Sequence, residues 1–362
     1  MAAGAADPDR RPASPSVTVR PIFILSAPRS GSTLLQRVLA SHPSVSTASE
    51  PWLLLPLLAP LVDGLPAPSG RERLVSIALA DLIEELPERA DDYRAAVRAM
   101  ALELYAKLTP PPATHFVDKT PMYHLIVDEL FRTFPEGLFV FLFRNPLSVL
   151  ASSVELLDAG RWEVSRYHMT LFRSFADLAP ACERHADRSI VVRYEDLVAG
   201  DERPWQRLFE HLELPWRPEV LSGFHRVRLR GRLGDPIGSA RYRSLSAGSV
   251  DRWRDAVCNP LRRTWCARYL RWLGRDRLAA MGYDLDALCA QLRACGHSAD
   301  HLFDDARRTA ASLLRELVKA RMPINSSRAS TWRALLGPPA TRAQQRRSRP
   351  GEVDLGQVRR PG

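Results

Sequence analysis

One stretch near the amino terminus constrains the fold more than any other. Residues 17–25 are apolar and rich in β-branched side chains, a pattern typical of a buried strand. The loop Ser26-Ala-Pro-Arg-Ser-Gly-Ser-Thr33 follows, and after it come apolar residues at helical spacing: Leu34, Leu35, Val38 and Leu39. In a tight loop between a strand and a helix, backbone N–H groups point toward an anion, and Gly31 allows its close approach. The alternative is a plain strand-to-helix turn with a serine cap.

The residues of this loop narrow the kind of anion. A nucleoside-triphosphatase loop would read GxxxxGK[ST], but here no lysine precedes Ser32 and Thr33, and the first glycine is absent. That lysine and the metal-bound hydroxyl serve a γ-phosphate together with magnesium. A loop that offers Arg29 instead suits a shorter anion. By itself, the loop indicates only an anion at the start of a helix.

Strand and helix patterns alternate along the rest of the chain. Strands are predicted over 45–49, 115–118, 138–143 and 189–193. Helices are predicted between them: two over 70–108, the first with an apolar stripe that includes Leu74, Ile77 and Leu82, and others over 122–134, 146–157 and 165–186. This alternation predicts an α/β fold, a P-loop-type three-layer domain whose central parallel sheet is flanked by helices.

The composition sets the expected boundaries of this domain. We predict a disordered N-terminal tail over 1–16, the main domain over 17–290, a helical C-terminal extension over 291–336, and a disordered basic tail over 337–362. No segment has the pattern of a signal peptide or of a membrane span. The five cysteines form no CxxC pair, which favours a reducing compartment, so we expect a cytoplasmic protein.

The charge balance favours an anionic ligand. The formal net charge is +10, and arginine supplies almost all of the positive charge, since only three lysines are present: Lys107, Lys119 and Lys319. Nucleotides, acidic glycans and nucleic acids all suit a basic protein. No nucleic-acid reader motif occurs, so we expect no nucleic-acid partner. A metal site is not expected either, because neither the nine histidines nor the five cysteines show the spacing of metal ligands.

A second anion site is indicated at the end of a later strand. The apolar run 139–143 ends at Arg144, where parallel sheets bind ligands. A helix begins after the next turn, and its Ser152 could close on the same anion. The alternative is an exposed arginine followed by serines on a helix surface.

Five pieces of the chain, in this order, resemble the sulfotransferases that use 3′-phosphoadenosine 5′-phosphosulfate (PAPS). They are PRSGSTLLQRVLASHP (28–43), VDKTP (117–121), FLFRNPLSVLASS (141–153), RYEDL (193–197) and GDPIGSARYRSLSAGSVDRW (234–253). They resemble most the tyrosylprotein-sulfotransferase-like and bacterial branch, which carries arginine rather than lysine in the loop. The resemblance covers residues 21 to about 285.

The resemblance implies a cofactor site. The loop residues would hold the 5′-phosphosulfate of PAPS: Arg29, Ser30, Gly31, Ser32 and Thr33. Arg144 and Ser152 would hold its 3′-phosphate. Tyr194 matches a tyrosine near the cofactor, and Arg243 matches a cation that closes over it.

The resemblance also implies that Glu50 deprotonates the acceptor hydroxyl, and a cation at Lys119 could meet the sulfuryl oxygens. The alternatives are a solvated carboxylate at a strand end and a structural pair with Asp118. His115 and His124 are weaker candidates for the base. Ser49-Glu50-Pro51-Trp52 carries a single carboxylate, unlike the corresponding segment of tyrosylprotein-type enzymes, which argues against a peptide tyrosine as the acceptor. For a cytoplasmic enzyme we expect a glycan, a glycolipid or a small metabolite instead.

Two functions therefore compete. The first is PAPS-dependent transfer of a sulfuryl group to an acceptor hydroxyl. The second is an ATP-dependent phosphotransferase of the P-loop type with a degenerate Walker A loop, which would need magnesium. No motif identifies the particular acceptor within the expected class, and no sequence signal indicates an oligomeric state.

Overall fold

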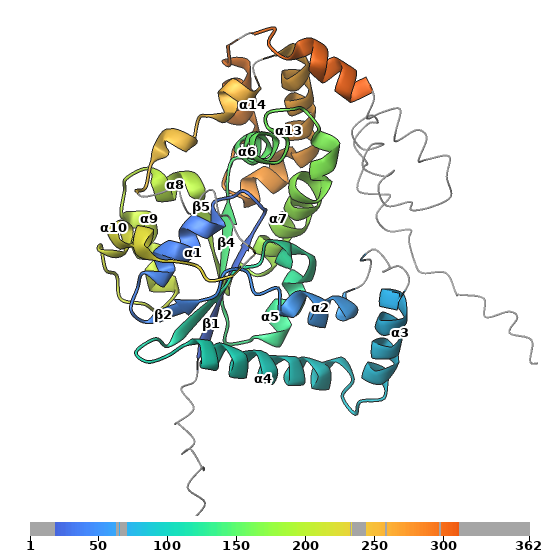
Figure 1. The fold of residues 1–362 in the computed structure, drawn as a ribbon, viewed down its shortest axis with the longest axis vertical. Coiled ribbons are helices and arrows are strands. Elements are labelled where there is room, and N and C mark those ends of the chain that lie inside the picture. The colour runs from blue at the N-terminus through green and yellow to red at the C-terminus, as the bar shows by residue number, and fades with distance from the viewer. Residues whose placement is uncertain are drawn as a thin grey trace, which may run out of the picture. The chain divides into compact units, whose positions relative to one another are not determined.

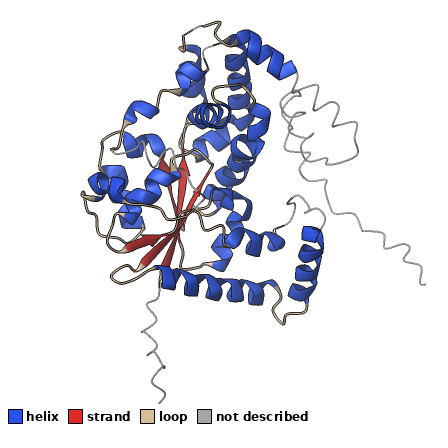
Figure 2. Ribbon diagram, in the orientation of Figure 1, coloured by secondary structure: helices blue, strands red, loops and turns tan. Residues whose placement is uncertain are grey.

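Five parallel strands form one sheet in the order β2-β3-β1-β4-β5 (Figures 1 and 2). The strands are β1 Arg20–Ser26, β2 Val45–Thr47, β3 His115–Asp118, β4 Leu138–Phe143 and β5 Ser189–Arg193. Helices cover both faces, so the predicted α/β fold class is confirmed. β3, β4 and β5 have the predicted bounds, whereas β2 ends two residues before the predicted end at Ser49.

This computed structural model describes residues 19–62, 65, 71–231, 233, 244–257, 259–296 and 298–310. The predicted tails over 1–16 and 337–362, most of the predicted extension over 291–336, and Arg243 lie outside the described residues.

The helices before β5 are α1 Ser32–Ala40, α2 Leu54–Leu58, α3 Arg71–Glu84, α4 Ala90–Leu108, α5 Val127–Thr133, α6 Pro146–Asp158 and α7 Ser174–Arg184. Those after it are α8 Tyr194–Val198, α9 Arg203–His211, α10 Val220–Gly223, α12 Trp253–Ala256, α13 Pro260–Ala280 and α14 Leu285–Arg293. The helix predicted over 122–134 is instead a 3₁₀ segment, η2 Pro121–Ile126, followed by α5, because Ile126 leaves helical geometry at φ −128° and ψ 23°. The helix predicted over 165–186 begins with 3₁₀ and π turns before α7.

The sequence of β4, Leu-Phe-Val-Phe-Leu-Phe, assigns a different chemistry to each face of the sheet. Successive side chains of a strand point to opposite faces. The aliphatic residues of β4 pack in the core beneath α1, α8 and α9, together with Ile22 and Ile24 of β1. Its phenylalanines lie on the side of α5, where Phe139 stacks on Phe131 with ring centroids 3.7 Å apart. All six residues are buried, as expected for a central parallel strand.

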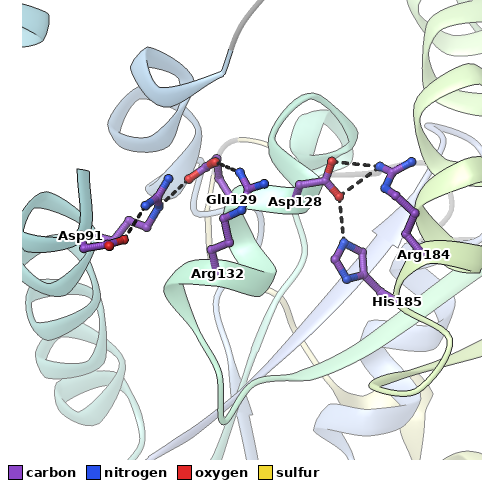
Figure 3. Close-up of polar contacts among 7 residues, drawn as sticks. Asp91, Asp128, Glu129, Arg132, Arg184 and His185 are labelled. Carbon is purple, nitrogen blue, oxygen red and sulfur yellow. Dashed lines mark hydrogen bonds and ion pairs between the residues drawn. The ribbon is translucent and has the colours of Figure 1, made fainter. Parts of the chain in front are cut away.

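Ion pairs join the helices over the aromatic face (Figure 3). Asp128 of α5 accepts hydrogen bonds from Arg184 of α7 at 2.9 Å and from His185 at 2.8 Å. The neighbouring Glu129 accepts a 2.7 Å hydrogen bond from Arg94 of α4. These contacts link α4, α5 and α7 across the outer surface of the layer.

Local capping signals set where several helices begin. The side chain of Asn145 accepts a hydrogen bond from the N–H of Leu147, and Pro146 occupies the first turn of α6. Asn259 and Pro260 repeat this arrangement at α13. Within the described part of the chain, no helix has the length and apolarity that crossing a membrane requires.

Candidate active site

The carboxyl ends of β1, β4 and β5 bring together the residues of the predicted anion sites. The loop after β1 turns sharply, since Arg29 and Gly31 both have positive φ, at 69° and 91°. Gly31 precedes α1, whose first N–H groups have no acceptor within the helix. Arg29 Nε lies 3.4 Å from Ser152 Oγ on α6, so the two predicted anion sites adjoin each other.

Arg144 is the centre of this cluster. Its Nη1 donates to the carbonyl of Arg29 at 3.1 Å, and its Nη2 donates to the carbonyl of Ser249 at 3.0 Å. The guanidinium lies over the ring of Tyr194, 4.6 Å from the centroid, and the Tyr194 hydroxyl is 2.9 Å from Ser249 Oγ. We call residues 29–33, Arg144, Ser152, Tyr194 and Ser249 the loop side of the site.

Two buried polar atoms of the loop side have no hydrogen-bond partner in the described part of the chain: Arg144 Nε and Ser30 Oγ. Leaving a buried donor unsatisfied costs about 1–3 kcal/mol, and more for a charged group. No carboxylate of the described residues pairs with Arg144. An anion such as a phosphate would supply the missing acceptors, so these residues fit the phosphate-rich cofactor that the sequence predicts.

The ends of β2 and β3 form a second cluster beside the first. Lys119 Nζ lies 2.6 Å from Glu50 Oε1, and their side chains are 1% and 12% exposed. Trp52 Nε1 donates to the other oxygen, Glu50 Oε2, at 3.2 Å. Lys119 thus pairs with Glu50, which lies 69 residues away in the chain. We call Glu50, Trp52, Asp118, Lys119 and Thr120 the Glu50 side of the site.

Two further segments hold the chain around Glu50 in place. Gln36, a fully buried residue of α1, donates to Thr47 Oγ1 at 2.8 Å and to the carbonyl of Ala48 at 2.6 Å. The segment after Arg226 also passes Ser49, whose N–H donates to the carbonyl of Arg230 at 3.3 Å. α1 thus contributes to both sides. Its first turn includes the last two residues of the loop 29–33, and its Gln36 fixes the segment between β2 and Glu50.

The two histidine candidates for the base do not share this position. His115 is the first residue of β3, so it lies at the opposite end of that strand from Lys119. His124 is buried, and its Nδ1 bonds to Asp177 of α7 at 2.9 Å. The carboxylate of Glu50 is the candidate base that lies beside Lys119.

Some residues of the site escaped the sequence analysis. Gln36 and Ser249 lie in two of the pieces that carry the resemblance, but neither was singled out, because a glutamine on a helix and a serine in a loop are common on protein surfaces. Asp118 was considered only as a partner of Lys119. Its carboxyl is completely buried, and burial raises its pKa to about 6, although hydrogen bonds from Tyr105, Tyr123 and Thr120 oppose that shift.

The structure is an α/β protein with clustered polar residues at the carboxyl edge of its sheet, and comparison with known proteins identifies its family. The profile of the sulfotransferase family matches residues 21–218, more than half of the chain. The chain therefore belongs to the sulfotransferase family and is a sulfotransferase. This result favours sulfuryl transfer over the predicted alternative of a phosphotransferase.

The chain is also similar to individual known proteins. The chain is 27% identical to protein-tyrosine sulfotransferase 1 of Danio rerio over 278 residues, which cover 73% of this chain and 72% of that protein. It is 33% identical to the nodulation protein NoeE of Sinorhizobium fredii over 288 residues, 72% of this chain and 65% of that protein. Among solved structures, the sulfotransferase domain of the Synechococcus olefin synthase covers 66% of this chain and 88% of its own, with 25% identity and a TM-score of 0.46.

Proposed function

We propose that this sulfotransferase uses PAPS as its donor and transfers the sulfuryl group to a hydroxyl of an acceptor. The observation that carries the proposal is the buried Arg144, whose Nε has no partner in the described part of the chain while both Nη atoms are held by backbone carbonyls. A positive group fixed in this way suits the 3′-phosphate, which distinguishes PAPS from an ordinary adenine nucleotide. We assign Ser152 to the same phosphate and Tyr194 to the neighbouring wall.

The anion loop would hold the 5′ end of the donor. Arg29, Ser30, Gly31, Ser32 and Thr33 surround the start of α1, where backbone N–H groups and the helix dipole favour negative charge. Arg29 supplies a positive charge that stabilises the negative charge developing on the phosphate oxygens during transfer. Arg243 belongs to the same proposal as a cation that closes over the donor.

The Glu50 side would activate the acceptor. The donor supplies a sulfuryl group bonded through oxygen to its 5′-phosphate. Glu50 takes the proton of the acceptor hydroxyl, and the acceptor oxygen forms a bond to sulfur. The bridging sulfur–oxygen bond breaks, and its electron pair remains on the phosphate near Arg29. Lys119 holds the Glu50 carboxylate before transfer and offers a positive charge to the sulfuryl oxygens.

The acceptor that we propose is a glycan, a glycolipid or a small metabolite. Glu50 is the single carboxylate in its segment, and the aromatic Trp52 lies beside it, an environment suited to a sugar or another neutral hydroxyl compound. The described cysteines are free thiols: Cys182, Cys266, Cys289 and Cys295. Free thiols are typical of a reducing compartment, which supports a cytoplasmic enzyme.

Calorimetric titration of the full chain tests the donor. The ligands are adenosine 3′,5′-bisphosphate, adenosine 5′-phosphate and ATP, each in EDTA and then with magnesium. Because hydrogen bonds to a charged group contribute about 1.5–3 kcal/mol, the bisphosphate should bind at least about tenfold more tightly than the monophosphate without magnesium. Equal affinities for the two adenosine phosphates, or tight binding of ATP only with magnesium, would overturn the proposal.

A further inference from the structure

The buried carboxylate of Asp118 is the hub of a hydrogen-bond network beneath the Glu50 side. Its Oδ2 accepts the hydroxyl of Tyr105 from α4 at 2.6 Å and the hydroxyl of Tyr123 from η2 at 2.8 Å. Its Oδ1 lies 3.4 Å from Thr120 Oγ1. None of these atoms belongs to the chemistry proposed above, so the network needs another explanation.

Two branches of the network reach the segment that carries Glu50. The N–H of Leu54 donates to the Tyr123 hydroxyl at 3.3 Å, and the N–H of Trp52 donates to Thr120 Oγ1 at 3.2 Å. Residues 50–54 are therefore attached to the end of β3 through Asp118. The attachment opposes local strain, since Trp52 has a φ of 53°, which is unfavourable for a bulky side chain.

Lys119 is attached from the other side, because it follows Asp118 directly in the chain. The same carboxylate thus fixes both members of the pair, Lys119 through the backbone and Glu50 through two hydrogen-bonded branches. We propose that Asp118 is a positioning residue, which sets the geometry of Glu50 against Lys119 through Tyr123 and Thr120. The proposal rests on the roles of Glu50 and Lys119 in the proposed function.

The two tyrosines provide a matched pair for the test. Both are almost completely buried, and both donate to the same carboxylate oxygen. Only Tyr123 continues to the Glu50 segment, through Leu54, whereas Tyr105 belongs to α4 and stacks on Phe116. Tyr123→Phe and Tyr105→Phe each remove one hydroxyl without changing the ring. Loss of stability should be similar in the two variants, but loss of positioning should differ.

The experiment measures amide hydrogen exchange over residues 50–58 in the full chain, by mass spectrometry, together with the melting temperature. Tyr123→Phe should speed exchange in this segment by about tenfold, whereas Tyr105→Phe should leave it unchanged. Donor turnover is followed as release of adenosine 3′,5′-bisphosphate from PAPS with water in place of the acceptor. Because a small misplacement of a reacting group can cost up to about a hundredfold, Tyr123→Phe should lower kcat at least about tenfold with unchanged bisphosphate affinity.

Asp118→Asn is the second variant, because its amide oxygen can still accept both tyrosine hydroxyls. It should keep the slow exchange of residues 50–58, as expected for rescue by a conservative change. Equal exchange in the two tyrosine variants would overturn the proposal, and so would faster exchange in Tyr123→Phe with unchanged kcat. A wild-type chain that fails to bind the bisphosphate would instead overturn the proposed donor, and the exchange comparison would still decide whether Asp118 orders the segment.

Discussion

Arg144 and Asp118 are both buried charged residues at the same edge of one sheet, but their surroundings differ. Arg144, on the loop side, contacts two backbone carbonyls and a ring and has one N–H without an acceptor among the described residues. Asp118, on the Glu50 side, has both oxygens in contact with hydroxyls, and the adjacent Lys119 is paired with Glu50. Arg144 thus keeps a buried donor that an anion would satisfy, whereas both oxygens of Asp118 already have partners among the described residues.

This difference is consistent with the two tasks that the proposed function assigns to these sides. In a donor site whose buried positive group lacks hydrogen-bond acceptors, phosphate binding is favourable, since the ligand supplies those acceptors. A base that must meet many acceptor molecules in one orientation benefits from a network that is already formed, because no ordering is then required at the moment of reaction.

Glu50→Gln should remove the base and lower turnover by about 10²–10⁴-fold while the affinity for adenosine 3′,5′-bisphosphate stays within twofold. Kinetics of donor turnover and calorimetry on the same sample check this separation. Glu103→Gln is the control, because Glu103 also lies 2.6 Å from a lysine, Lys107, but on the exposed surface of α4. If both variants retained full turnover, Glu50 would not be the base.

Gly31→Ala should damage the loop side. A Cβ at this position would lie 2.3 Å from Tyr194 Cδ2, and the φ of 91° strains any residue with a side chain. We expect a loss of about 2–3 kcal/mol in the free energy of unfolding, together with weaker bisphosphate binding. Gly160→Ala is the matched control, since its φ is 83° with no atom within 4 Å of the added Cβ. Equal losses in urea unfolding would show that the approach of Tyr194 has no energetic importance.

The buried carboxyl of Asp118 should make stability depend on pH. Its pKa is raised from 3.8 to about 6, so between these values the folded chain binds a proton that the unfolded chain has released. The contribution of Asp118 to stability is therefore present at low pH and is lost as the pH rises through about 6. Relative to Asp118→Asn, the wild-type free energy of unfolding should fall by roughly 2 kcal/mol from pH 4 to pH 7. Urea unfolding at both pH values measures this difference, and a constant gap would contradict it.

Arg144→Ala should lower the preference for adenosine 3′,5′-bisphosphate over adenosine 5′-phosphate by about tenfold, since one charged phosphate contact is lost. Competition calorimetry with the two ligands measures the ratio of affinities. Arg188→Ala is a suitable control, because Arg188 also donates to backbone carbonyls and lies over an aromatic ring, that of Phe131. An unchanged preference in Arg144→Ala would remove the proposed 3′-phosphate site.

Much of the fold could be predicted because the signals are local. The ends of β3, β4 and β5 match the predicted ends, and β4 is an apolar run that alternates aliphatic and aromatic residues on its two faces. The apolar stripe of α3 was also predicted, but the structure leaves it largely exposed. Leu74 is 68% exposed and Leu82 57% exposed, so periodicity indicated a helix without indicating what covers it.

The candidate site divides in the same way. The anion loop was visible because it is contiguous, and Arg144 was visible because it ends an apolar strand. Ser249 was not singled out, since its contacts with Arg144 and Tyr194 join segments that are 105 and 55 residues apart in the chain. The network of Asp118 was hidden for the same reason, because each of its tyrosines is an ordinary apolar position of a helical segment until the fold brings it to the strand end.

The alternation of strands and helices, the position of the loop over residues 26–33 and the family could be read from the chain alone, because they follow from side-chain periodicity and from residues adjacent in the chain. The tertiary structure decided the strand order, the pairing of Glu50 with Lys119, and the closure of Tyr194 and Ser249 around Arg144. Those features depend on contacts between distant segments, whose free energies become decisive only when the whole core packs.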